Sequence, residues 1–154
     1  MHTFKKRVFL SILVTLLGIT THCNAAATGD KTSKEAIKQE TAQLLHSLKS
    51  YSIEQRDEAV RETEAALKNI DRRIEALEAH IDKGWDKMDK VAREKARESL
   101  KALRTQRTQV AEWYERLKNS AGASWGHIKD GFSDAYRAFG KAWEQAENEF
   151  GSQE

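Results

Sequence analysis

Residues 125–146 read WGHIKDGFSDA followed by YRAFGKAWEQA, two copies of an 11-residue pattern with large apolar side chains at matching places. Trp125 aligns with Tyr136, and Phe132 aligns with Trp143. Eleven residues fill three helical turns at about 3.67 residues per turn, so these positions stay on one side of a straight helix. The pattern therefore predicts an amphipathic helix with a single aromatic stripe.

This aromatic helix is predicted to span residues 123–150, after a break of small residues. Its stripe is expected to be buried against another surface. Each large apolar side chain gains about 1.5–3 kcal/mol on leaving water. We assign partner binding or self-association to the stripe and a residue upstream of it: Tyr114, Trp125, Ile128, Phe132, Tyr136, Phe139, Trp143 and Phe150. Three surfaces remain as alternatives for burying the stripe: this chain or a second copy, a protein partner, or a membrane surface. From Trp113 onward five basic residues face seven acidic ones, whereas membrane-surface helices favour Lys and Arg.

Between residues 53 and 118, apolar residues recur at alternating spacings of three and four, which is the seam of a coiled coil. Ser52 and Gln55 have the spacing of a capping box, so we expect a helix to begin at Ile53. The pattern breaks at Gly84 and restarts after it. The seam residues are Val60, Thr63, Leu67, Ile70, Ile74, Leu77 and Ile81, then Trp85, Met88, Ala92, Ala96, Leu100, Leu103, Val110, Tyr114 and Leu117. We expect the aromatic stripe to be separate from this seam.

Charge favours a turn at the break. Residues 53–82 hold five basic and nine acidic side chains, a net of −4, and residues 83–111 hold nine basic and four acidic, a net of +5. A turn near residues 83–90 lays one segment against the other. We therefore predict an all-α fold, with a helix at 33–51, an antiparallel helical hairpin (coiled coil) at 53–118, and the C-terminal aromatic helix. The alternative is one continuous helix paired with an antiparallel second copy, which satisfies the same charges between chains.

The first 25 residues have the pattern of a signal peptide. A basic segment, Lys5 to Arg7, precedes an apolar run of 12 residues, Val8 to Ile19, and small residues end the segment at Ala25. The run is short for a membrane span, which needs about 20 residues. A retained anchor and lipid attachment at Cys23 are the alternatives. Residues 26–32 are small and polar and predict a flexible tether, and the chain is expected to be periplasmic or secreted.

Removing the signal peptide changes the charge of the chain. The 26 basic residues become 26 − 3 = 23 against 24 acidic ones, a net of −1, so no nucleic-acid partner is expected. The basic residues of 83–107 alternate with acidic ones and are expected to form a solvated helix face, with polyanion binding as the alternative. The cleaved chain has no cysteine, which suits an oxidising compartment without disulfides.

The composition argues against catalysis. The chain has 154 residues, 32% of them charged, and no proline, which is the composition of long helices. His46, His80 and His127 are far apart in sequence and lack the spacing of zinc ligands. No phosphate-binding loop or nucleophile motif occurs in the cleaved chain. We predict no enzyme activity, no metal, no cofactor and no small-molecule substrate.

Five stretches carry a resemblance to a known group of proteins: YSIEQRDEAV at 51–60, WDKM at 85–88, AEWY at 111–114, GFSDAY at 131–136 and AWEQA at 142–146. They resemble small exported coiled-coil proteins of Gram-negative bacteria, usually labelled hypothetical or stress-response proteins. The resemblance implies export and a stress-related role, and it implies no catalytic residues.

Together these patterns predict a non-enzymatic periplasmic coiled-coil protein, acting in envelope stress response, scaffolding or chaperone-like binding through its aromatic helix. Its partner is expected to be a second copy or an envelope protein. The alternative is a peripheral protein that binds the membrane surface of the cell envelope.

Overall fold

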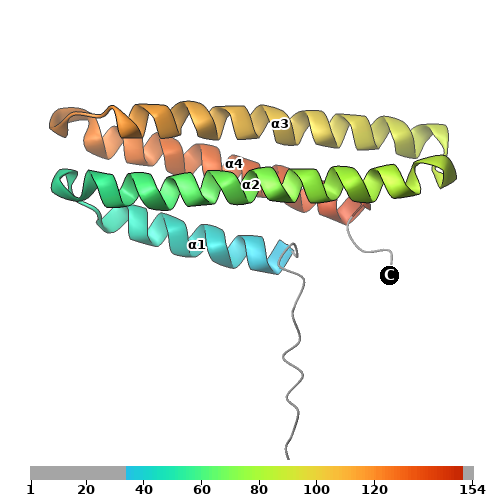
Figure 1. Ribbon diagram of the computed structural model, residues 1–154, viewed down its shortest axis with the longest axis horizontal. Coiled ribbons are helices and arrows are strands. Elements are labelled where there is room, and N and C mark those ends of the chain that lie inside the picture. The colour runs from blue at the N-terminus through green and yellow to red at the C-terminus, as the bar shows by residue number, and fades with distance from the viewer. Residues whose placement is uncertain (1–33, 151–154) are drawn as a thin grey trace, which may run out of the picture.

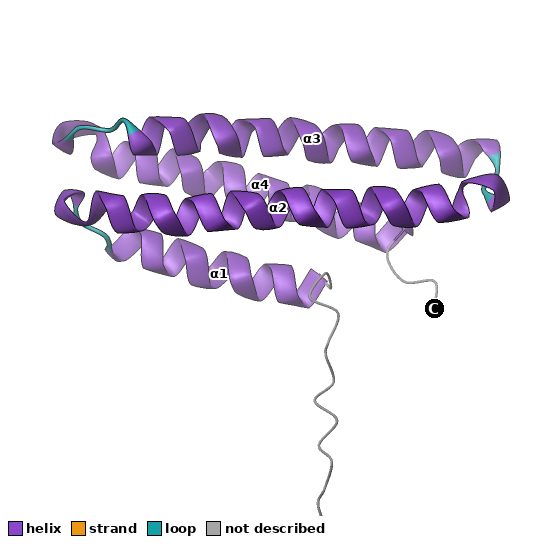
Figure 2. Ribbon diagram, in the orientation of Figure 1, coloured by secondary structure: helices purple, strands orange, loops and turns teal. Residues whose placement is uncertain are grey.

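The computed structural model describes residues 34–150, and this part of the chain consists of helices and short connections without a strand (Figure 2). The α-helices are α1 (Lys34–Ser50), α2 (Arg56–Gly84), α3 (Lys90–Lys118) and α4 (Trp125–Phe150). Short 3-10 helices η1 (Ile53–Gln55), η2 (Trp85–Lys87) and η3 (Gly122–Ser124) precede α2, α3 and α4. The predicted all-α class is confirmed. The predicted signal peptide (1–25) and tether (26–32) lie outside the described residues.

Successive helices run in opposite directions and lie side by side as a bundle (Figure 1). α3 packs on α2 and, most extensively, on α4, while α1 packs on α4 and less closely on α2. With 17 residues against 29 in α2 and α3, α1 is about 25 Å long where they reach about 44 Å. α1 therefore extends along only part of the length of the bundle.

Local sequence signals set the helix ends. The Ser52 amide donates to the Gln55 side chain at 3.2 Å, and the predicted capping box is confirmed. α2 ends at Gly84, where the seam pattern breaks. Asp89 starts α3 by accepting a hydrogen bond from the Ala92 amide at 2.8 Å, which satisfies one of the unpaired amides of the first turn.

A single hydrophobic core runs through all four helices. Its most buried large side chains come from each of them: Leu48, Ile70, Ile81, Leu103, Val110, Leu117, Phe132 and Phe139. The expectation that the aromatic stripe is separate from the seam is therefore wrong. The stripe and the seam pack into one core, because α4 lies along α3. The stripe of α4 covers apolar side chains of α2 and α3 that a two-helix hairpin would leave exposed.

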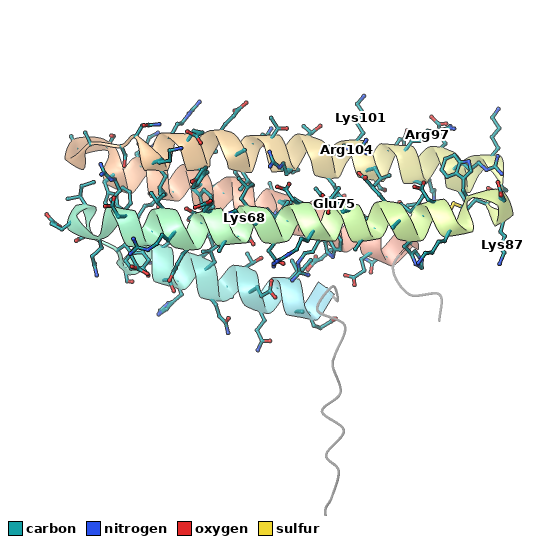
Figure 3. The ribbon with its side chains drawn as sticks, in the orientation of Figure 1. Lys68, Glu75, Lys87, Arg97, Lys101 and Arg104 are labelled. Atoms are coloured by element: carbon teal, nitrogen blue, oxygen red, sulfur yellow. The ribbon has the colours of Figure 1, made fainter. Side chains whose placement is uncertain are left out.

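Opposite charges on α2 and α3 meet across the bundle surface. Arg104 donates to Glu78 at 2.6 Å, and Arg107 forms two hydrogen bonds with Asp71 at 2.7 and 2.8 Å. Figure 3 shows Arg97, Lys101 and Arg104 along α3 and Lys68 and Glu75 along α2. Exposed pairs of this kind contribute at most about 1 kcal/mol each, so the core supplies most of the stability.

At the end of the bundle that holds the α1–α2 and α3–α4 connections, polar contacts join the two connections. The backbone carbonyl of Tyr51 accepts from the Trp125 indole at 2.9 Å and from the Lys129 ammonium at 2.6 Å. Lys129 also reaches the Lys49 carbonyl at 3.1 Å. Residues of α4 thus satisfy the carbonyls that the C-terminus of α1 leaves unpaired.

Candidate functional site

The aromatic stripe lies inside the bundle. Of the eight residues assigned to partner binding or self-association, the structure buries Trp125, Phe132, Tyr136, Phe139 and Trp143, and half-buries Tyr114, Ile128 and Phe150. Phe132 and Trp143 are only 0% and 3% exposed. The rest of the chain thus covers the stripe in this state. A role of these residues in binding a partner stays a prediction, and it requires the bundle to open.

The rings of the stripe stack in sequence along α4. Phe132 and Tyr136 lie 5.9 Å apart between ring centres and nearly parallel, at 20°. The steps from Tyr136 to Phe139 and from Phe139 to Trp143 are 6.5 and 6.3 Å. Contacts at these distances add about 0.5–1.5 kcal/mol each beyond area burial. From Phe132 to Trp143 the stripe is therefore one continuous aromatic surface.

α1 covers the stripe on one side. Ile37 and Leu48 of α1 are buried, and Leu44 and Leu45 pack half-buried against the core. At Gly140 the two helices approach closely, since a Cβ there would lie 3.9 Å from the Thr41 hydroxyl. This is ordinary van der Waals distance, so α1 and α4 are in direct contact at this level.

A buried arginine joins α1 to α2. Arg73 is 4% exposed and donates to the Glu40 carboxylate at 2.6 Å, and Asn69 donates to the same oxygen at 2.8 Å. The second terminal nitrogen of Arg73 is buried and has no partner among the described residues. The sequence prediction treated Arg73 as one charge among many and missed its burial. Ala66 and Ala59, seven and fourteen residues earlier, were the available signal, since small residues at that interval mark another packed helix face.

Beside Arg73, a groove of about 450 Å³ opens between α1 and α2. Leu44, Ala65, Ala66 and the Tyr136 ring line it together with Glu40, Asn69, Arg72 and Arg73. Burial, with a smaller contribution from the Glu40 charge, raises the pKa of Tyr136 to about 12. The Tyr136 phenol is therefore neutral at physiological pH.

A second groove, of about 440 Å³, lies between α3 and α4, and Trp113 forms one of its walls. The Arg116 guanidinium lies 4.5 Å above the Trp113 ring, and the His127 ring meets that indole edge-on at 6.1 Å between centres. Gly131 lies against the indole. The prediction did not include Trp113 in the candidate site, because it lies outside the 11-residue pattern.

At the α2–α3 connection, two arginines stack on one indole. Arg93 and Arg97 lie 5.5 and 5.1 Å from the ring centre of Trp85, and Arg93 also donates to the Trp85 carbonyl at 3.1 Å. The Trp85 ring thus holds the turn against α3 through contacts with two cations. Polyanion binding along residues 83–107 stays an untested alternative.

No other chemistry emerges from the described part of the chain. Within residues 34–150, no three His, Cys, Asp or Glu side chains come together as a metal site, and His46, His80 and His127 are exposed. None of the described helices is both long and apolar enough to cross a membrane. Comparisons with protein-family models, with curated proteins and with solved structures found no match.

Proposed function

We propose that this chain is a non-enzymatic, periplasmic binding protein of the bacterial cell envelope, a chaperone-like, scaffolding or stress-response factor that takes up apolar segments of other proteins. In this proposal α2 and α3 form an antiparallel coiled-coil hairpin that serves as the frame, and α4 supplies the binding surface. The basic and apolar leader at residues 1–25 and the lack of cysteine after Cys23 support export.

The observation that carries the proposal is the covering of the aromatic stripe by the shortest helix. Tyr136 lines the groove beside α1, Gly140 lies against Thr41, and Trp125 donates to the Tyr51 carbonyl just after α1. Movement of α1 away from the bundle would therefore uncover one side of the stripe, while the contacts of α4 with α3 stay in place.

The contacts of α1 are few enough for such a movement. Ile37 and Leu48 are the buried apolar residues that α1 contributes within residues 34–150, at 5% and 1% exposed. Their burial is worth roughly 3–6 kcal/mol in total, at about 1.5–3 kcal/mol each. Local openings below the free energy of global unfolding are common in proteins, and binding surfaces are often drawn from such segments.

Charge favours a protein partner over an anionic membrane. α4 contains three basic residues, Lys129, Arg137 and Lys141, and five acidic ones, Asp130, Asp134, Glu144, Glu147 and Glu149, a net of −2. A helix of this charge gains nothing from anionic headgroups, which attract Lys and Arg. Binding to the membrane surface is the alternative function.

A reversible cross-link between α1 and α4 tests the proposal. The Thr41 hydroxyl lies 3.9 Å from the Cβ position of Gly140, so side chains at these two positions are in contact, as a disulfide requires. In a chain beginning at Ala26, Thr41→Cys with Gly140→Cys introduces the only two thiols. The assay is light scattering from a heat-unfolded reporter protein, with and without the purified variant.

We expect the reduced variant to suppress aggregation of the reporter and the oxidised variant to lose most of this effect. The reduced sample is the matched control, because it has the same sequence. Equal suppression by both forms would show that α1 need not move. Binding only to anionic vesicles, with no effect on the reporter, would favour the membrane alternative.

A further inference from the structure

The groove between α1 and α2 combines an apolar wall with a buried cation. We propose that it binds a small anionic amphiphile, a molecule with an apolar chain and a carboxylate or similar headgroup. Such a ligand would be held and not converted. The proposal does not depend on the movement of α1, because the groove is present in the closed bundle.

The apolar half of the groove suits a hydrocarbon chain. Leu44 of α1 and Ala65 and Ala66 of α2 form its walls, and Tyr136 of α4 also lines it. The two alanines leave room where larger side chains would close the space between the helices. The volume, about 450 Å³, falls within the roughly 300–1,000 Å³ of small-molecule sites.

The polar half of the groove favours an anionic headgroup. Arg73 is nine-tenths buried, yet one of its terminal nitrogens has no partner among the described residues. A buried donor without a partner costs about 1–3 kcal/mol. A headgroup oxygen would remove this cost after a small shift of the guanidinium toward the groove, because the free nitrogen itself has almost no exposed surface. Glu40 is already engaged by Arg73 and Asn69 through one oxygen.

The charge of the lining agrees with this assignment. Arg72 and Arg73 contribute two positive charges and Glu40 one negative charge, a net of +1 for the residues around the groove. Arg72 is exposed and donates to Asn69 at a long 3.3 Å, so its guanidinium keeps donors available at the rim. A neutral or cationic amphiphile gains none of this attraction.

The test is a calorimetric titration of the purified chain with dodecanoate below its micelle concentration. Dodecyl maltoside and dodecyltrimethylammonium, which carry an alkyl chain one carbon longer on neutral and cationic headgroups, are the controls. We expect one dodecanoate per chain, bound at least tenfold more tightly than either control. In methyl NMR spectra, the Leu44 resonances should shift, and those of Leu103, which is fully buried in the core, should not.

Matched variants locate the site. Ala65→Leu enlarges a side chain on the groove wall and should weaken dodecanoate binding at least fivefold. Ala79→Leu should leave it unchanged, because Ala79 is exposed like Ala65 on the same helix but does not line the groove. Arg72→Gln should weaken dodecanoate binding at least threefold without changing the affinity for dodecyl maltoside. Arg73 is left intact because its loss would disturb the fold around Glu40.

Several outcomes would overturn the assignment: no binding of dodecanoate, equal affinity for the three headgroups, or equal effects of Ala65→Leu and Ala79→Leu. Each of these would leave the proposed uptake of protein segments untouched, because that function is measured by the redox state of the Thr41–Gly140 cross-link. Failure of the cross-link experiment would likewise leave the groove proposal standing.

Discussion

The indole of Trp113 lies directly against Gly131, so that a Cβ on Gly131 would lie 2.4–2.5 Å from three indole carbons. Glycine inside a helix normally costs about 1 kcal/mol relative to alanine. Here the missing side chain lets α3 and α4 approach each other. The Arg116 guanidinium lies over the same indole and the His127 ring meets it at 6.1 Å between centres, so a shift of the indole would disturb both contacts.

Gly131→Ala should therefore destabilise the bundle. Overpacking costs about 1–3 kcal/mol, and the gain in helix propensity offsets part of it. We expect a net loss of about 1–2 kcal/mol in the free energy of unfolding, measured by urea denaturation followed by circular dichroism.

Gly126→Ala is the matched control in the same helix. A Cβ there would have no neighbour within 4 Å, so the variant should gain up to about 1 kcal/mol in stability. If both variants were stabilised, the close packing of Trp113 on α4 would be refuted.

The shared core predicts that damage to the aromatic stripe unfolds the whole bundle. Phe139 is 1% exposed, and Phe139→Ala should cost about 3–5 kcal/mol. Val91→Ala, at a side chain that is 65% exposed, should change stability by less than about 0.5 kcal/mol. Thermal unfolding should remain a single transition. If α2 and α3 stayed folded in a variant whose α4 had unfolded, the stripe and the seam would be independent, as the sequence predicted.

The contact between Arg73 and Glu40 predicts non-additive effects. Glu40→Ala leaves a buried guanidinium without its carboxylate, and we expect a loss of about 1–3 kcal/mol. Arg73→Met in the Glu40→Ala background should cost less than Arg73→Met alone, because no unpaired charge remains. A double-mutant cycle from urea denaturation measures the coupling. Additive effects would mean that the ion pair contributes nothing to stability.

The raised pKa values of two tyrosines predict a loss of stability at high pH. The hydrogen bond from the Tyr51 hydroxyl to Glu62, at 2.7 Å, raises the pKa of Tyr51 to about 12. Burial raises the pKa of Tyr136 to about 12. Both values exceed that of an unfolded tyrosine, about 10, so the folded state holds these protons more tightly. The resulting stability is complete below pH 10 and is lost as the pH rises towards 12.

Urea denaturation between pH 9 and 12 measures this dependence. The double variant Tyr51→Phe with Tyr136→Phe should lose stability less steeply with pH than the parent chain. The comparison isolates the two tyrosines, because Lys68 and Lys118, whose pKa values are raised by Glu64 and Glu115, titrate in both proteins. Identical pH profiles would show that Tyr51 and Tyr136 do not cause the loss of stability at high pH.

The sequence predicted the helices well because periodicity reports directly which side of a helix is apolar. The seam positions Ala96, Leu103, Val110 and Leu117 are buried at intervals of seven residues along α3. The 11-residue pattern likewise placed Phe132, Phe139 and Trp143 on the buried side of α4. In both helices, local spacing was enough to identify the apolar face.

Periodicity does not say which surface covers an apolar face. The features of the site that the sequence did not predict depend on how the helices pack against one another. Arg73 is buried because α1 and α4 pack near a flank of α2 that a two-helix seam would expose. The contact of Trp113 with Gly131 joins residues eighteen positions apart on different helices. Both features follow from tertiary packing, which also merged the stripe and the seam into one core.

Native-state hydrogen exchange tests the central claim, that α1 leaves the bundle while α3 and α4 stay paired. We predict that the amides of Leu45 and Leu48 in α1 exchange through an opening at least about 2 kcal/mol below the free energy of global unfolding. The amides of Leu103 and Val110 in α3 and of Phe139 in α4 should exchange only by global unfolding. Exchange of α1 at the same free energy as α3 and α4 would contradict the claim.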